Sequence, residues 1–536
     1  MLKHLLLCIV VFYTSINFAQ QEEAWVFLAD KENVAESLSN PISILSQAAI
    51  DRKNTHNIPI DFKDVPVNEA YISQLKLQTG IAVRAKSKWL NAIHVSGTET
   101  NILALTELEF VASIEFADRS LNTSNGRVAT TTDKFEIENT QVDFTYGQAQ
   151  NQVAMIGVDV LHENDFTGEG IIIAVIDAGF PNVNTMSGFQ RLRDNGDLLG
   201  GYDFVDRTDN VYASTASDHG TKVMSTMGGY IENTYVGTAP DASYYVFRTE
   251  DALSENPVEE SYWVEAAERA DSLGVHIINS SLGYKQYDNS TYNYSNEDLD
   301  GQTAFISRGA QLASEKGILV VNSAGNSGAS GITAPADAAG VFTIGAVDAS
   351  GNYASFSSQG SANQLTPKPD VVARGSFSAV IDDNDAIVNI SGTSFSSPII
   401  AGAIASLLQA FPNRSIEDIK NDIRASASQF ENHDYFLGYG IPNFWNTYQN
   451  VLSVEAFDVF EVNIYPNPVV SSFTVQLPAQ SEMADLQIYS VLGKQLLHKT
   501  LSQEEETVDV STIASGVYII KISIGKKSNT FKFIKS

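Results

Sequence analysis

Cysteine is almost missing from this chain, which has one in 536 residues. That residue, Cys8, lies inside the apolar stretch 5–12 near the N-terminus, a position too early and too apolar for a lipoprotein cysteine. Removal of this stretch leaves no cysteine in the protein. Disulfide bonds are therefore excluded, and stability has to come from a packed core, with bound ions as a further source.

Basic residues are also scarce. The chain has 33 Lys and Arg against 64 Asp and Glu, which gives a formal net charge of −31. A charge of this sign argues against nucleic acid or an anionic membrane as a partner, because both would repel the protein. We interpret the excess as a solubility property of a secreted protein.

After its N-terminus, the chain lacks any apolar segment that the sequence marks as long enough to span a bilayer. The run 5–12 is itself too short, but it follows Lys3 and His4 and precedes Asn17-Phe18-Ala19. This arrangement predicts a secretory signal peptide over residues 1–19, cleaved near Ala19.

The composition is that of a globular protein, with 43% apolar and 18% charged residues. At 536 residues the chain is too long for one core and predicts three or four units.

The most informative motif is S-G-T-S-F-S-S-P at residues 391–398. It precedes an apolar run, 399–411, that predicts a buried helix. Pro398 lacks an N–H group, so we expect it in the first turn of that helix. Ser394 would then stand at a helix N-terminus, where free N–H groups favour developing negative charge. This context suits a serine nucleophile, and the alternative is a serine-rich helix cap.

A serine nucleophile needs a base, and the base needs a carboxylate to orient it. Among eight histidines, only His219 lies before a small-residue helix start, in D-H-G-T at 218–221. Asp177 ends the apolar, strand-length run 171–176, and α/β sheets place function at the carboxyl ends of buried strands. Taken singly, His219 could be a helix-start residue and Asp177 a turn residue.

A candidate oxyanion donor follows another predicted strand. Residues 317–326 indicate a buried strand that ends in a tight glycine turn, A-G-N. The side-chain amide of Asn326 would donate a hydrogen bond to a tetrahedral oxyanion, with the Ser394 N–H as the second donor. The alternative is an ordinary turn asparagine.

Four motifs, D-A-G, H-G-T, A-G-N and G-T-S-F-S-S-P, occur in the order found in subtilisin-like serine peptidases. The chain resembles this family over roughly residues 150–450. The resemblance implies that Ser394 is the nucleophile, His219 its base, Asp177 the orienting carboxylate and Asn326 an oxyanion donor.

The resemblance also implies where substrate binds, since an exposed strand edge can pair with an extended peptide. The expected substrate-binding residues are Ser281, Leu282, Gly283, Ala324 and Gly325. Two positions depart from the family pattern. Ala178 stands where a Thr or Ser hydroxyl usually follows the acid, so a hydroxyl that could support the Asp177 carboxylate is absent. Phe395 replaces the commoner Met after the nucleophile.

Helical spacing at 263–273 and 305–313 precedes predicted strands at 275–280 and 318–322. This alternation predicts an α/β catalytic domain over 151–450, with a parallel sheet covered by helices on both faces.

Residues 20–117 form a separate α+β unit. Strands are expected at 24–28, 89–95 and 110–115, and helices at 66–77 and 98–108. The pattern resembles the inhibitory propeptides of subtilisin-like peptidases, which makes the protein's own propeptide its expected inhibitor. A permanent N-terminal binding domain is the alternative. Residues 118–150 are rich in Thr, Asn, Ser and Gln and are interpreted as a linker where processing occurs.

Residues 456–536 differ from the preceding part of the chain in their strand pattern and charge. Short alternating strands at 486–489 and 516–522, with a turn at 492–494, predict a small β-sandwich. Five lysines and no acid lie between Gly516 and Ser536. The Y-P-N-P, L-G-K and S-G-V-Y-I-I-K-I segments resemble the C-terminal sorting domain of the type IX secretion system. This implies outer-membrane secretion machinery as a partner, and passage through the periplasm to the cell surface or medium. The alternative is a carbohydrate- or substrate-binding sandwich.

The sequence therefore predicts a secreted subtilisin-like serine endopeptidase that is made as an autoinhibited precursor and cleaves proteins or peptides. Its chemistry requires no cofactor. Calcium is common in the family, but no carboxylate cluster is specific enough to assign a metal. A catalytically weak surface adhesin and an esterase on the same fold remain as alternatives.

Overall fold

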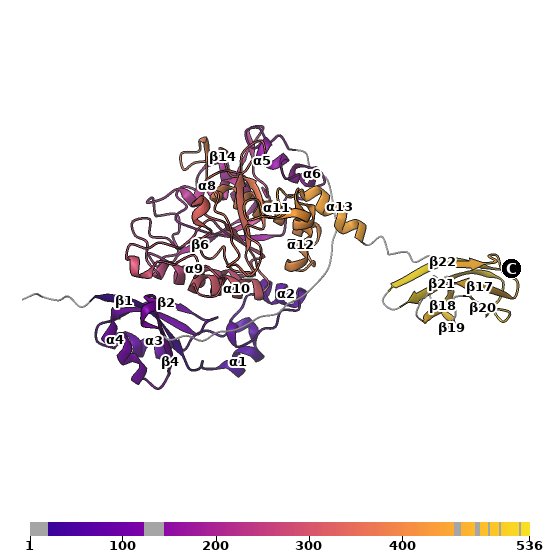
Figure 1. Ribbon diagram of the computed structural model, residues 1–536, viewed down its shortest axis with the longest axis horizontal. Helices are drawn as coiled ribbons and strands as arrows, with labels where there is room; N and C mark the ends of the chain where they lie inside the picture. Colours follow the sequence, from indigo (N-terminus) through magenta and orange to yellow (C-terminus); the bar gives the residue numbers. More distant parts are fainter. Residues whose placement is uncertain are drawn as a thin grey trace, which may run out of the picture. The chain divides into compact units, whose positions relative to one another are not determined.

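The computed structural model describes residues 20–122, 144–454, 462–477, 483–490, 494–502, 505–524 and 527–536. The expected signal peptide, the middle of the expected linker and Leu492-Gly493 lie outside these ranges, so the predictions for them stay predictions. The chain divides into two compact units, Met1–Tyr448 and Gln449–Ser536 (Figure 1).

An antiparallel sheet of four strands, in the order β2-β3-β1-β4, forms the N-terminal part of the first unit. Its strands are β1 (Gln21–Leu28), β2 (Ile81–Ser87), β3 (Ala92–Thr98) and β4 (Val111–Phe116), and its helices are α1 (Val34–Ser39), α2 (Gln47–Thr55), α3 (Glu69–Lys76) and α4 (Glu99–Leu103). The predicted α+β pattern is confirmed in β1, β3, β4, α3 and α4. Strand β2, where charged residues interrupt the apolar ones, and helices α1 and α2 have no counterpart among the predictions.

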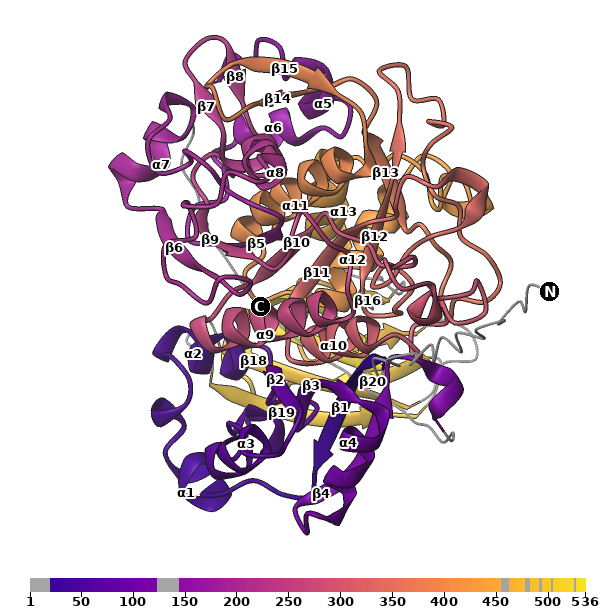
Figure 2. The same ribbon diagram turned by 90° about the vertical axis from the view of Figure 1, so that its left-hand side faces the viewer.

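The two faces of this small sheet bury different partners. Apolar residues of β1, β3, α3 and α4 form a core on one face. The other face packs on α9 (Val258–Leu273) and α10 (Phe305–Glu315), where the Trp25 and Phe305 rings stack with centroids 4.5 Å apart. The N-terminal sheet is therefore docked on α9 and α10 (Figures 1 and 2).

The remainder of the first unit is built on a sheet of seven strands in the order β13-β12-β11-β10-β5-β9-β6, with parallel pairing throughout. The strands are β5 (Ile172–Asp177), β6 (Leu198–Asp203), β9 (Ser243–Arg248), β10 (Ile277–Ser280), β11 (Leu319–Ser323), β12 (Phe342–Val347) and β13 (Val371–Arg374). After β9 the chain crosses to the opposite side of β5. The carboxyl ends of β5 and β10 therefore flank a topological switch point, where α/β sheets bind ligands.

Helices cover both faces of this sheet, as predicted. Helices α9 and α10 lie on one face, and α8 (His219–Gly228) and α11 (Thr393–Ala410) lie on the other (Figure 2). The other elements of the unit are α5 (Gln150–Ala154), α6 (Val158–His162), α7 (Gln190–Asn195), α12 (Ile416–Ser426), α13 (Phe444–Val454), and the hairpins of β7 (Tyr230–Ile231) with β8 (Tyr235–Val236) and β14 (Ser378–Ile381) with β15 (Ile387–Ile390).

Helix α11 is the buried helix that the apolar run predicts, but it begins earlier than expected. Contrary to the expectation that no later segment is long enough to span a bilayer, α11 could cross a membrane by length and composition, yet 94% of it is buried inside the protein, which makes it a core helix. It starts at Thr393, so Pro398 is its sixth residue and lies inside the helix. The prediction that Pro398 occupies the first turn is wrong, and the carbonyl four residues earlier, that of Ser394, loses its helical partner.

The second unit has two antiparallel sheets and its own core. One sheet contains β16 (Asn463–Tyr465), β17 (Ser472–Gln476) and β20 (Glu505–Asp509), and the other contains β18 (Ala484–Ser490), β19 (Gln495–Leu501), β21 (Gly516–Ile524) and β22 (Lys527–Lys535). Phe473, Leu486, Ile520 and Phe533 are among the buried residues that both sheets contribute to this core. The predicted β-sandwich is confirmed.

Candidate active site

Asp177 and His219 meet above the carboxyl end of β5. Asp177 Oδ1 lies 2.6 Å from His219 Nδ1, and the aspartate is fully buried. Gly220 permits this approach, because a Cβ atom there would lie 2.9 Å from Asp177 Cβ and 2.6 Å from the Gly179 carbonyl oxygen. The H-G pair of the sequence motif thus reflects close packing of α8 against the end of β5.

Asp177 favours the protonated, positively charged form of His219. Burial opposes a charge on His219, but the charge and hydrogen bond of Asp177 outweigh burial and raise the pKa of the imidazole above its usual 6.5. Asp177 Oδ1 also accepts from the Ala178 N–H at 2.7 Å. Its other oxygen, Oδ2, is buried without a hydrogen-bond partner among the described residues. The missing hydroxyl at position 178 therefore coincides with an unsatisfied carboxylate oxygen.

Ser394 is the second residue of α11 and is 8% exposed. The ring of the next residue, Phe395, lies 5.8 Å from the His219 ring, centroid to centroid, which places the histidine beside the start of the helix. In the part of the chain that the structure describes, no hydrogen bond joins the Ser394 hydroxyl to His219. Such bonds are often long in free enzymes and tighten only when substrate is bound.

Asn326 is held in one orientation by α11. Its Oδ1 accepts hydrogen bonds from the Thr393 N–H at 2.8 Å and the Thr393 hydroxyl at 3.0 Å. A Cβ atom on Gly392 would lie 3.5 Å from Asn326 Nδ2, so the amide nitrogen faces the backbone just before the nucleophile. This nitrogen is therefore available to donate to an oxyanion beside Ser394. The anchoring role of Thr393 was not predicted, although the threonine stands in the G-T-S motif.

The predicted substrate-binding segments meet at the same helix start. The Ser281 hydroxyl donates to the Ser394 carbonyl oxygen at 2.9 Å, and the Gly325 N–H donates to the Thr393 hydroxyl at 3.2 Å. Ser281 and Ala324 are buried, Leu282 and Gly325 are half-buried, and Gly283 is exposed. The structure thus brings Ser281, Gly325 and Asn326 into hydrogen-bond contact with the first residues of α11, and places His219 beside Phe395. Asp177 joins through His219, and Leu282, Gly283 and Ala324 adjoin these residues in the chain.

One carboxylate group has the spacing of a metal site in the described part of the chain. Ligand atoms of Glu250, Glu255 and Glu259 lie within 4.8 Å of one another. Burial and the neighbouring carboxylates raise their pKa values to about 8, 7 and 9. Acids of this kind hold protons near neutral pH, and proximity alone does not assign a metal to them.

A comparison with known families agrees with this geometry. The family described as "Subtilase family" matches residues 168–440, which are half of the chain. The chain belongs to the subtilase family. It is therefore a subtilisin-like serine peptidase, and the predicted fold class is confirmed.

Two further families match the flanking parts of this subtilase. A "Peptidase S8 propeptide domain, Bacteroidota" matches residues 23–134, and a "Secretion system C-terminal sorting domain" matches residues 463–536. The predicted propeptide and type IX sorting domain are thereby confirmed at the level of the family. The sorting domain assigns the subtilase to the cell surface or the extracellular space.

Several curated relatives resemble the catalytic part. Subtilisin BL of Lederbergia lenta is 28% identical over 295 residues, which cover 54% of this chain and 95% of the relative. Subtilisin DY of Bacillus licheniformis is 29% identical over 296 residues, which cover 54% of this chain and 95% of the relative. Among solved structures, the prenylagaramide maturation protease PagA has a TM-score of 0.44 and 23% identity, covering 55% of this chain and 98% of its own.

Proposed function

We propose that this subtilase is a secreted endopeptidase that hydrolyses peptide bonds through an acyl-enzyme on Ser394. His219 takes the proton of the Ser394 hydroxyl and returns it to the leaving amine. Asp177 orients His219 and stabilises its cation, and Asn326 with the Ser394 N–H binds the oxyanion. The observation that carries this proposal is the 2.6 Å pair of Asp177 and His219 beside the helix that bears Ser394.

The orientation of Asn326 supports the oxyanion role. An amide whose oxygen is held by Thr393 at 2.8 Å and 3.0 Å presents its N–H groups in a fixed direction. A donor fixed before the reaction needs no reorganisation when negative charge develops.

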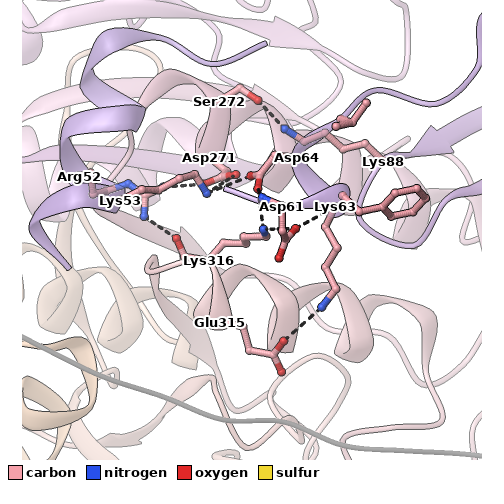
Figure 3. Close-up of polar contacts among 12 residues, drawn as sticks. Arg52, Lys53, Asp61, Lys63, Asp64, Lys88, Asp271, Ser272, Glu315 and Lys316 are labelled. Atoms are coloured by element: carbon pink, nitrogen blue, oxygen red, sulfur yellow. Dashed lines mark hydrogen bonds and ion pairs between the residues drawn. The ribbon is translucent and has the colours of Figure 1, made fainter. Parts of the chain in front are cut away.

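The N-terminal domain is proposed to keep this site inactive before export. Its contact with the catalytic part contains a network of buried charges (Figure 3). Lys53 Nζ lies 2.9 Å from Asp271 Oδ1 and 3.1 Å from Asp64 Oδ1, and Lys316 Nζ lies 2.7 Å from Asp64 Oδ2. None of these four side chains is more than 5% exposed. A network of this kind favours one docking geometry, which an inhibitor of its own enzyme requires.

The experiment that tests the proposal compares the secreted protein with its Ser394→Ala variant on casein and on a p-nitrophenyl ester. We expect casein cleavage by the parent and a loss of about 10⁶-fold in the variant, as for the equivalent change in subtilisin. Ester turnover without casein cleavage would favour the esterase. Casein cleavage that survives in Ser394→Ala would reject Ser394 as the nucleophile, and inactivity of both would favour the adhesin.

A further inference from the structure

Asn322 connects the end of β11 to the predicted substrate-binding segment. It is fully buried, and its register partner on β10 is Ser280, the last residue of that strand. Beyond this pair the Asn322 side chain continues the connection between the strands. Its Nδ2 donates to the Leu282 carbonyl oxygen at 3.0 Å and to the Ser323 carbonyl oxygen at 2.8 Å. One amide group therefore holds two backbone segments beside the candidate active site.

The orientation of the Asn322 amide follows from its neighbours. Both groups that its Nδ2 contacts are carbonyl oxygens, which accept hydrogen bonds and would repel the amide oxygen. The nitrogen therefore has to face them, and Oδ1 is buried without a hydrogen-bond partner among the described residues. A buried acceptor without a partner costs free energy, and such groups need an explanation. The two donated bonds offset this cost.

The bond to Leu282 determines which edge of segment 281–284 is free. In an extended chain, the backbone N–H and C=O groups of successive residues point to opposite sides. The Leu282 carbonyl faces Asn322. Two residues later, Tyr284 exchanges two backbone hydrogen bonds with Ala334, at 2.8 and 3.1 Å. Alternate residues of the segment are therefore paired inside the protein.

The backbone groups of the other two residues, Ser281 and Gly283, point to the opposite side of the segment. Ser281 adjoins the candidate nucleophile, because its hydroxyl donates to the Ser394 carbonyl oxygen at 2.9 Å. An extended peptide that pairs with these free backbone groups would therefore lie beside Ser394. A displacement of Leu282 from Asn322 would move both free groups together.

We propose that Asn322 is a positioning residue for peptide substrates. It holds the inner edge of the segment, so that the backbone groups of Ser281 and Gly283 stay aligned for an extended peptide. The inference rests on the proposed function, because it requires a peptide acylated at Ser394. A small ester has no peptide backbone to pair with this edge, so its turnover should not depend on Asn322.

The test compares a peptide that has four residues before the cleaved bond with a p-nitrophenyl ester, using enzyme secreted from the full-length chain. Asn322→Ala should raise KM for the peptide roughly tenfold, the scale of one or two hydrogen bonds, and leave kcat nearly unchanged. The pairing holds substrate and transition state alike, so its loss acts on KM. The kinetic constants for the ester should stay close to those of the parent.

Asn322→Asp keeps the shape of the side chain but turns an acceptor toward two carbonyl oxygens. It should therefore weaken peptide binding at least as much as Asn322→Ala.

Gln152→Ala is the matched control. Gln152 is also a fully buried amide, whose Nε2 donates to the Ala379 carbonyl oxygen at 3.0 Å and whose Oε1 accepts from the Ala379 N–H at 2.9 Å. It holds β14, which lies outside the predicted substrate-binding segments. Its loss should lower the thermal stability of the enzyme without changing KM for the peptide.

Two results with folded Asn322→Ala would overturn the inference and leave the proposed function intact: an unchanged KM for the peptide, or equal losses on peptide and ester. The parent supplies a test that needs no variant. Its kcat/KM should rise as the peptide is lengthened from one residue to three before the cleaved bond, because pairing with two alternate residues needs a stretch of three. No rise would overturn the inference even if no Asn322 variant folds. A parent that cleaves neither the peptides nor casein rejects the proposed function as well.

Discussion

The Ser281 hydroxyl donates a hydrogen bond to the backbone carbonyl oxygen of Ser394, 2.9 Å away. In an uninterrupted helix this carbonyl would accept from the N–H group four residues later, but that residue is Pro398, which has none. A side chain from the predicted substrate-binding segment therefore completes the helix turn that carries Ser394, the proposed nucleophile. Ser281 is a positioning residue for Ser394, in addition to its predicted place beside the substrate.

Loss of this hydroxyl should destabilise the helix start. In a Ser394→Ala background, which prevents autolysis, Ser281→Ala should lower the free energy of unfolding by about 1–3 kcal/mol, because the carbonyl stays buried and unpaired. With Pro398→Ala also present, the new N–H can take the place of the hydroxyl, and the same change should cost much less. Urea unfolding of all four combinations measures the coupling. Equal costs in both backgrounds would show that the bond contributes nothing.

Asn326→Ala should lower kcat about 100- to 1,000-fold and leave KM nearly unchanged, because the proposed partner of the Asn326 amide is charge that exists only in the transition state. Asn326→Asp keeps the acceptor for Thr393 but has no amide donor, so it should lose at least as much. Initial rates on a single peptide separate the two constants. A raised KM with normal kcat would make Asn326 a binding or turn residue instead.

The local structure at the candidate catalytic residues is predictable from the sequence: a strand end for Asp177, a helix start for His219 and a glycine turn before Asn326. The sequence does not reveal how residues far apart in the chain meet. The bond from Ser281 to Ser394 depends on where α11 begins, and the expected position of Pro398 was wrong because the helix boundary is set by packing.

The propeptide interface shows the same limit. Asp64 and Lys316 are separated by 252 residues, and neither lies in a motif. The sequence therefore predicts that the N-terminal unit exists, but the buried charges that dock it on α9 and α10 are tertiary contacts.

The loss of activity at low pH should follow the protonation of His219. Catalysis needs the neutral imidazole, and the pKa of His219 is raised, so activity should fall as pH drops through a value above 6.5. In Asp177→Asn the burial that opposes the charge remains, while the carboxylate that raises the pKa is gone. The acid limb should then move to lower pH, with kcat reduced about 10⁴-fold. The measurement is kcat/KM against pH for both proteins.

Asp218→Asn is the control for this shift. Asp218 also raises the pKa of His219, but it is a smaller influence than Asp177 and forms a half-buried ion pair with Lys222. In Asp218→Asn the pH at which kcat/KM falls on the acid side should move far less than in Asp177→Asn. If the pH at which kcat/KM falls is unchanged in Asp177→Asn, a group other than His219 controls the loss of activity at low pH.

Asp64→Asn should weaken inhibition by the N-terminal domain. The change removes the buried carboxylate that Lys53 and Lys316 share, and leaves Asp271 and Asp61 as their remaining partners. A buried charge left without any partner costs about 3–5 kcal/mol, and the remaining partners reduce this cost. We therefore expect the inhibition constant to rise at least about tenfold. The measurement uses residues 20–122 added in trans to the mature enzyme, with circular dichroism to confirm that the variant domain is folded.

Asp61→Asn provides a matched comparison for Asp64→Asn. Asp61 pairs with the same Lys316 at 2.8 Å, but its side chain is 43% exposed. Exposed pairs contribute up to about 1 kcal/mol, so inhibition should weaken by less than about tenfold. If the Asp61 and Asp64 variants inhibit as well as the parent domain, the buried network does not determine docking. If even the parent domain fails to inhibit at micromolar concentration, the N-terminal unit is a binding domain.

Deletion of residues 456–536 should leave catalysis intact and trap the enzyme in the periplasm. All predicted catalytic residues precede Tyr448, where the first unit ends, and the deleted segment carries a core of its own. The deletion therefore removes a β-unit that separate machinery can recognise, and no strand of the catalytic sheet. Fractionation of a host with a type IX system, with activity assayed in periplasm and medium, tests this. A periplasmic passenger fused to residues 456–536 is the complementary control and should reach the surface or medium.

Equal secretion of the truncated and full-length enzymes would reject the sorting role, because export would then need nothing in this unit. Secretion with lost binding to an insoluble substrate would assign the β-sandwich to substrate binding instead.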